Sequence, residues 1–377
     1  MIYYDNAATT RVFDECVDCL KEYNQNEYFN PSALYAKASD IKILLDKVRE
    51  NFKKRLHAPE GNLYFLSSGS EGDNTVLFGV KKRKDSKIIV GDGEHDAIYN
   101  SALELKNQGY NVEFAPIKSD GAVDIEKLSA MLDESVCLVS VMHVSNETGA
   151  INDLKAISSL IKKKSTKAVF HSDGVQAYGK IDVNLRELGV DAYTISGHKI
   201  HAPKGVGALW IKKGVNVKPL IYGGGQESGF RSSTENVASI MAFDKASELI
   251  FTDFDQKISQ KSGIREYLKE FILKNVPETV VLSPENGASH ILTVAFKNLR
   301  GEVLLHALEK KDVLVGIGSA CSSHRESRFK KLLGLDEYHR DGIVRFSFGL
   351  FNTLDEAKIA ASIIADTANE WNKFIRK

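Results

Sequence analysis

Two kinds of apolar pattern alternate along the chain. Between Ile41 and Leu56 the apolar side chains recur at helical spacing, with lysines and acidic residues on the other face, which predicts an amphipathic helix packed on a sheet. Short apolar runs predict strands at residues 63–66, 87–90, 112–117, 136–144, 168–171, 192–195 and 208–211. Helical stretches separate these runs, and this alternation is typical of an α/β fold in which helices cover both faces of a largely parallel sheet.

The last third of the chain has a different order of elements. Those predicted there are a charge-rich helix at 254–274, a strand at 291–296, a helix at 301–309, a strand at 343–348 and a last helix. We therefore predict an N-terminal segment (1–14) associated with a small domain, a large domain (15–255) and a small α+β domain (256–377).

Charge and length narrow the class of protein. The chain has 377 residues, and its 50 basic and 50 acidic side chains leave no net charge, which argues against nucleic acid or a membrane surface as the main partner. No apolar run is long enough to span a bilayer, and the first residues lack the pattern of a signal peptide. We expect a soluble, cytoplasmic enzyme.

The four cysteines are too few and too scattered for a disulfide framework. Cys16 and Cys19 form a C-x-x-C without a second cysteine or histidine pair, so we predict no metal site there. Cys137 lies in an apolar run and is expected in the core. Cys321 differs from these three because it lies in a loop of small residues after a strand-like run, where a reactive thiol is expected.

A candidate reactive amine follows one of the predicted strands. The run 190–195 ends in a Ser-Gly-His-Lys turn that brings Lys199 to the end of a buried element. A buried amine is either paired or used covalently, for example as a Schiff base with an aldehyde cofactor. A surface lysine in a glycine-rich loop explains this stretch equally well.

Other polar side chains follow neighbouring predicted strands. The turn at 67–74 joins a strand to a helix start, where backbone N–H groups and Ser70 can hold a phosphate, although an ordinary capped helix also explains it. His95, Asn146 and Asp173 each come shortly after another strand. We expect all of them, with Lys199, at one edge of the sheet.

Ten segments, taken in order, resemble the cysteine desulfurases, pyridoxal-phosphate enzymes of the class V aminotransferase group. These segments are residues 5–10, 30–32, 67–74, 94–95, 146–149, 173–176, 196–199, 223–236, 318–323 and 345–349. The Gly-Ser-Ala-Cys-Ser-Ser form of the cysteine loop is similar to the branch that includes the nitrogen-fixation and iron-sulfur-cluster enzymes. The resemblance implies the fold type I of pyridoxal-phosphate enzymes, with a mostly parallel seven-stranded sheet in the large domain.

The resemblance also implies roles around the cofactor ring. Lys199 would hold pyridoxal 5'-phosphate as a Schiff base and, once displaced by substrate, would move protons at the substrate Cα. Asp173 would pair with the pyridine nitrogen and keep it protonated. Gln176 and Asn146 would hydrogen-bond the phenolic oxygen side of the ring and the bound substrate. His95 would stack on the ring face and serve in proton relay.

The same resemblance assigns the residues that hold the phosphate. The Gly69 backbone and the Ser70 hydroxyl would bind it beside Ser196 and His198. Thr234 would reach the phosphate of a partner subunit, so a homodimer is implied.

Arg345 and Cys321 are the residues that the resemblance assigns to the substrate, L-cysteine. Arg345 would bind the substrate carboxylate through a bidentate fork. The Cys321 thiolate would attack the substrate sulfur, leaving alanine and a Cys321 persulfide. The persulfide sulfur would pass to an acceptor protein in iron-sulfur cluster assembly, thio-cofactor synthesis or tRNA thiolation.

The chain departs from the family pattern at several positions. The departures are Arg11 for proline, Tyr35 for histidine, Lys37 for glycine, Ser145 for asparagine, Ser228 for arginine, and a segment after Cys321 that is about two residues short. They leave a related enzyme as an alternative, namely a carbon-sulfur lyase, a selenocysteine lyase or an aminotransferase. A third alternative is a non-enzymatic partner in a sulfur-transfer assembly.

Overall fold

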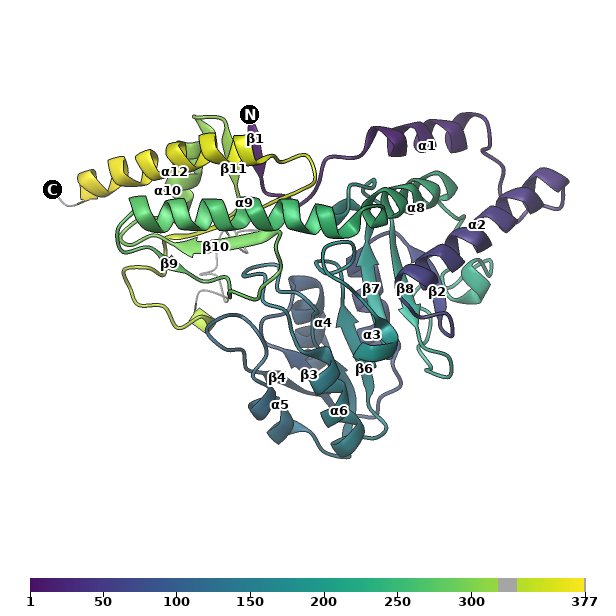
Figure 1. Cartoon of the computed structure of the whole chain (residues 1–377). Helices are drawn as coiled ribbons and strands as arrows, with labels where there is room; N and C mark the ends of the chain where they lie inside the picture. Colours follow the sequence, from purple (N-terminus) through teal and green to yellow (C-terminus); the bar gives the residue numbers. More distant parts are fainter. Residues whose placement is uncertain (318–330, 376–377) are drawn as a thin grey trace.

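The computed structural model describes residues 1–317 and 331–375, and a seven-stranded sheet is its central element (Figure 1). The strand order is β2 (Asn62–Leu66), β8 (Gly207–Ile211), β7 (Ala192–Ser196), β6 (Val169–Asp173), β5 (Val136–Ser140), β3 (Lys87–Gly91) and β4 (Asn111–Ala115). Only β8 runs antiparallel to its neighbours, which confirms the predicted mostly parallel α/β sheet.

Helices cover both faces of this sheet, and each face has its own hydrophobic cluster. On one face α2 (Ala36–Arg55), α6 (Leu154–Lys164) and α8 (Val237–Phe251) bury residues such as Phe52, Ile157 and Phe243. On the other face α3 (Gly69–Gly79) and α4 (Asp96–Asn107) bury a second set that includes Leu77 and Ile98. Three further helices complete this part of the chain: α1 (Asp14–Gln25), α5 (Ile125–Met131) and α7 (Leu185–Leu188).

The amphipathic pattern predicted between Ile41 and Leu56 forms the greater part of α2. Its buried side chains are Ala38, Ile41, Leu45, Val48 and Phe52. Burying such aliphatic and aromatic groups contributes roughly 1.5–3 kcal/mol each, so packing on the sheet rather than helix propensity accounts for most of the stability of α2.

A third cluster holds the C-terminal part of the chain together. Strands β12 (Ile343–Ser347), β10 (Ile291–Ala295) and β9 (Val280–Val281) form an antiparallel sheet. It packs with the helices α9 (Phe254–Asn275), α10 (Gly301–Glu309) and α12 (Leu354–Ile375). Figure 1 shows these helices beside the small sheet, away from the lower part of the large one.

The N-terminus joins this C-terminal cluster. Strand β1 (Ile2–Tyr4) pairs in parallel with β11 (Val313–Val315), and the ring of Tyr4 is buried among the residues of the cluster. This pairing suits the association predicted for segment 1–14, while the residue limits of the two domains remain a prediction. Within the two described ranges, no helix combines the length and apolarity needed to cross a membrane.

Two predicted strands of the large sheet extend two or more residues beyond the strands of the structure. The run 136–144 was expected to be one strand, but β5 ends at Ser140. Beyond it, the Met142 N–H donates to Glu94 Oε1 (2.6 Å) and the His143 N–H donates to the carbonyl of Asp173 (2.9 Å). The bond to Glu94 takes the Met142 N–H out of the ladder, whereas the bond from His143 continues the pairing with β6 that Val141 makes through the carbonyl of His171. The side chains of residues 141–144 stay buried. The run 112–117 likewise exceeds β4, which ends at Ala115.

Candidate functional site

The candidate residues gather where the parallel strands of the large sheet end. Asp173 is the last residue of β6, and Ser196 is the last residue of β7. The short 3-10 helix η1 (Gly197–Lys199) follows at once and carries Lys199. The turn after β2 begins α3, and the turn after β3 leads to His95, which caps α4. The expectation that these turns share one sheet edge therefore holds for the described structure.

Lys199 is half-buried against the N-terminal segment. Its Nζ donates to the backbone oxygens of Ala7 (2.6 Å) and Ala8 (2.8 Å). Gln176 donates through Nε2 to the same Ala7 oxygen at 2.9 Å, so Gln176 and Lys199 share one acceptor. Lys199 is therefore not a freely solvated surface lysine, and its predicted covalent role stays a prediction.

Asp173 is a buried carboxylate with few partners. Its side chain belongs to a residue that is 6% exposed, and Oδ1 accepts one backbone N–H, from Val175, at 2.8 Å. Burial raises its pKa, while the positive charges of His95 and Lys199 act in the opposite direction. A carboxylate held in this way gains from a cationic hydrogen-bond donor, and a protonated pyridine nitrogen is such a donor. The buried carboxylate of Asp173 therefore fits the pyridine nitrogen of pyridoxal phosphate.

The start of α3 also fits the phosphate of that cofactor. A Cβ on Gly69 would approach Val175 Cγ2 to 2.7 Å, so glycine lets the helix start pack against the turn after β6. The helix is capped by Ser68, whose Oγ accepts the N–H of Glu71 at 3.1 Å. The exposed Ser70 therefore keeps its hydroxyl, which bonds to no residue among those described. The Ser70 hydroxyl is thus accessible to a ligand, and its predicted contact with a phosphate stays a prediction.

Two histidines lie near this edge, and each makes a hydrogen bond through Nδ1. Ala97 donates its N–H to Nδ1 of the exposed His95 at 3.1 Å, so the proton of a neutral His95 is on Nε2. His198 Nδ1 lies 3.2 Å from Thr9 Oγ1, and burial with the nearby Lys199 charge lowers the pKa of His198 to about 3. His198 is thus neutral at physiological pH and binds as a hydrogen-bonding group rather than a cation.

Arg345, on β12, enters the site from the C-terminal part of the chain. Its Nη1 donates to the Asn146 backbone oxygen at 2.7 Å, and its Nη2 pairs with Asp5 Oδ1 at 3.0 Å. Its Nε is buried and has no hydrogen-bond partner among residues 1–317 and 331–375. A buried guanidinium edge of this kind is costly unless a ligand accepts from it, and a carboxylate is the acceptor whose geometry matches.

The segment that carries Cys321 begins beside Arg345. Gly316 exchanges both backbone hydrogen bonds with Arg345 (2.8 and 2.9 Å), and a Cβ there would meet Asp5 Oδ1 at 2.7 Å. Cys321 itself lies outside the described residues. Thr234 is exposed and makes no contact with the other candidates within the described chain, so its predicted role toward a partner subunit stays a prediction.

Sequence analysis missed two buried charged residues that support the site. Glu227 accepts from Arg49 Nη1 (2.7 Å) and from the Phe65 N–H (2.9 Å), which fixes the loop 223–236 to α2 and β2. Lys180 donates to Gln176 Oε1 at 2.7 Å. The only signal for Glu227 was its place in a family-like segment, and a lysine after a glycine gave no signal of burial.

Comparison with known proteins decides the family. The model of the family described as aminotransferase class-V matches residues 2–359. The chain belongs to the class-V aminotransferase family. This assignment confirms the resemblance based on the ten ordered segments, and with it the fold type expected for the sheet.

Two relatives and one solved structure show how much of the chain the similarity covers. The chain is 35% identical over 368 residues to a cysteine desulfurase of Nostoc sp. PCC 7120, covering 95% of this chain and 90% of the relative. It is 34% identical to the cysteine desulfurase IscS of Clostridium botulinum strain Hall, covering 96% and 93%. A solved NifS-like protein superimposes with a TM-score of 0.90 at 31% identity, covering 97% and 98%.

Proposed function

We propose that the protein is a pyridoxal-phosphate-dependent cysteine desulfurase that converts L-cysteine to L-alanine and leaves a persulfide on Cys321. The observation that carries this proposal is that Lys199 and Arg345 both bond to residues 5–8, while the buried carboxylate of Asp173 lies close enough to Lys199 for the lysine charge to lower its pKa. An amine, a buried carboxylate and a guanidinium with an unused donor there match the three groups that an amino acid and a pyridine aldehyde require.

The cofactor, when bound, would supply an electron sink for the substrate Cα. Lys199 would hold it and move the Cα proton, and Asp173 would keep its ring nitrogen protonated. Gln176 and His95 would orient and cover the ring. Arg345 would hold the substrate carboxylate, with Asn146 beside it.

The phosphate would lie at the start of α3. Gly69 and Ser70 would donate to it from the helix, and Ser196 and His198 from the neighbouring turn. Thr234 of a second subunit would complete the site, so the active form would be a homodimer working in the cytoplasm.

Sulfur transfer would then need only the thiolate of Cys321. Its sulfur would bond to the substrate sulfur as the substrate C–S bond breaks. The released electron pair stays on the substrate carbon, which takes a proton and leaves as alanine. The sulfur atoms are oxidised and the carbon is reduced, so no external electron donor enters. An acceptor protein would take the terminal sulfur.

The names of the relatives favour this activity over a carbon-sulfur lyase, a selenocysteine lyase or an aminotransferase. To test it, purified protein with pyridoxal phosphate is supplied with L-cysteine, and alanine and protein-bound persulfide are measured. We expect equal amounts of alanine and transferred sulfur. A need for a keto acid such as pyruvate would indicate an aminotransferase instead.

Two variants separate the cofactor from the sulfur chemistry. Borohydride reduction followed by peptide mapping should place the cofactor on Lys199. The Lys199→Ala protein should retain no covalently fixed cofactor after the same treatment. Cys321→Ala should keep the cofactor and lose the persulfide, while Cys137→Ala, on β5, should behave as the parent protein. Equal turnover by Cys321→Ala and the parent would refute the persulfide step.

A further inference from the structure

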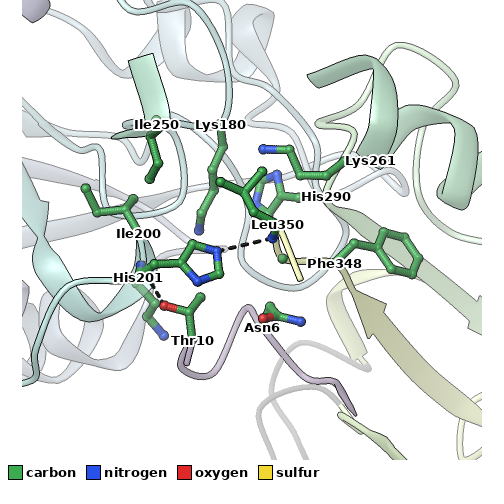
Figure 2. Close-up of a pocket in the computed structure, with 13 residues that line it drawn as sticks. Asn6, Thr10, Lys180, Ile200, His201, Ile250, Lys261, His290, Phe348 and Leu350 are labelled. Atoms are coloured by element: carbon green, nitrogen blue, oxygen red, sulfur yellow. Dashed lines mark hydrogen bonds between the residues drawn. The ribbon is translucent and has the colours of Figure 1, made fainter. Parts of the chain in front are cut away.

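A small cavity lies at the junction of the N-terminal segment, the large sheet edge and the C-terminal part. Its lining includes Lys199, two further amines, Lys180 and Lys261, and the imidazole of His290 (Figure 2). Lys180 and Lys261 are only 6% and 4% exposed. Two buried amines beside the proposed cofactor lysine are unusual, because burial disfavours their charge.

Only one of these two amines has a hydrogen-bond partner among the described residues. Lys180 Nζ donates to Gln176 Oε1 at 2.7 Å, and His290 Nε2 lies 3.3 Å from the same oxygen. Lys261 Nζ makes no hydrogen bond or ion pair with any residue of the two described ranges. Lys180 therefore has a specific contact with the site, and Lys261 serves as its natural control.

The contacts of Gln176 fix which way its amide faces. Oε1 receives donors from Lys180 and His290, whereas Nε2 donates to the carbonyl of Ala7 at 2.9 Å. A carbonyl can only accept, so the flipped amide would lose its bond to Ala7, and it would also lose the bond from Lys180 when that lysine is charged. The second N–H of Nε2 remains available to a ligand at the sheet edge.

We infer that Lys180 is a positioning residue that acts through Gln176, holding its amide so that an N–H faces the phenolic oxygen of the bound cofactor. This inference rests on the proposed function and adds a residue to it. Without Lys180, the amide can rotate and present its oxygen to the cofactor oxygen, which is repulsive. The shared Ala7 carbonyl would then also lose a donor, so the acceptor of Lys199 would be less well fixed.

The ionic surroundings of Lys180 come from several elements. Burial lowers its pKa well below the usual value, and the charges of Lys199, Lys261 and Arg345 lower it further, against Asp173. The inferred role requires only an N–H donor, which the amine provides in either protonation state. A neutral donor at this position should therefore restore part of the function.

A double-mutant cycle on the holoenzyme tests the inference. Lys180→Met and Gln176→Met should each shift the visible absorption band of the bound cofactor and lower kcat about tenfold, with KM for L-cysteine changed less than about twofold. If Lys180 acts through Gln176, the double variant should be no worse than Gln176→Met alone. Lys261→Met should leave the band and kcat as in the parent protein.

Further measurements keep the result decisive if Lys180→Met folds poorly. Lys180→Gln, which keeps an N–H donor, should recover most of the parent spectrum. Additive losses in the double variant, or a parent-like spectrum of Lys180→Met, would overturn the inference. The absorption band of the bound cofactor in the parent protein tests the proposed function separately. If the parent protein shows no such band, the proposed function fails, whatever the variants show about the coupling of Lys180 to Gln176.

Discussion

Replacing Arg345 with lysine tests the substrate site most directly. The guanidinium uses one nitrogen on the Asn146 carbonyl and another on Asp5, and its buried Nε bonds to no described residue, so it is the donor that the proposed substrate carboxylate would use. A lysine amine has a single nitrogen on a flexible stem and cannot serve all three directions. Arg345→Lys keeps the positive charge, so any loss reports the geometry of the fork rather than net charge.

The expected loss can be worked from these contacts. A hydrogen bond to a charged group contributes about 1.5–3 kcal/mol, and about 1.4 kcal/mol corresponds to a factor of ten in affinity. Losing the carboxylate contact of Nε should therefore raise KM for L-cysteine about 10- to 100-fold. Stability should fall less, by about 1 kcal/mol, because the Asp5 side chain is 25% exposed and water can solvate it.

Arg265 provides a matched control for this substitution. It is another buried arginine of the C-terminal part, and it donates to the backbone oxygens of Ile291 (3.1 Å) and Pro284 (2.6 Å), neither of which is a candidate site residue. Arg265→Lys should destabilise the protein and leave KM unchanged. Initial rates over a range of L-cysteine concentrations, with cofactor content measured by absorbance, decide the outcome. An Arg345→Lys protein that keeps its cofactor and a KM within twofold of the parent would refute the proposed carboxylate contact.

Three further predictions concern stability. Glu227→Gln should cost about 2 kcal/mol in urea unfolding, because the partly buried Arg49 loses its short ion pair at 2.7 Å and keeps only the longer one with the exposed Asp46 at 3.9 Å. Glu50→Gln, at an exposed pair, should cost under about 0.5 kcal/mol, and equal losses would contradict this prediction. Burial lowers the pKa of Lys261 to about 8 from its usual 10.5, so the unfolded chain binds more protons than the folded one between these pH values. The parent protein should therefore gain stability relative to Lys261→Met as the pH rises from 8 to 10, by up to about 1.4 kcal/mol per pH unit. Parallel stability profiles of the two proteins would argue against this prediction. Burial lowers the pKa of His171 to about 3, so the protein should lose stability as the pH falls below about 6.5, and His171→Gln should lose it less steeply. Thermal unfolding from pH 7 to 5 measures the difference, and an equal slope in both proteins would rule it out.

Much of the large sheet was predictable because its strands are buried on both faces. Such strands appear as short continuous apolar runs, and every predicted run of the large domain corresponds to a strand. Strand ends were less predictable, since a buried backbone can leave the ladder when a side chain offers a better acceptor. Glu94 does this after β5, and its carboxylate gives no local apolar signal.

The location of the candidate site was predictable from the sequence, but the buried residues that hold its side chains in place were not. Parallel strands end at one edge, so residues that follow them meet there whatever their separation in sequence. The buried positions of Lys180 and Glu227 could not be predicted, because charged residues are usually exposed and only tertiary packing buried these two. The orientation of Gln176 depends on such packing as well, and no spacing rule encodes it.

The N-terminal segment links the two parts of the chain at the residue where the proposed cofactor amine is held. The Ala7 N–H donates to Ser347 Oγ of β12 at 2.8 Å, and the Ala7 carbonyl accepts from Lys199 and Gln176. One residue is thus bonded to the C-terminal sheet on one side and to the edge of the large sheet on the other. Any shift of β12 relative to the large sheet must move the acceptor of Lys199 or break one of these bonds. Since Arg345 lies on the same strand, the positions of the proposed carboxylate-binding arginine and of the proposed cofactor amine are coupled through the backbone of a single residue, Ala7.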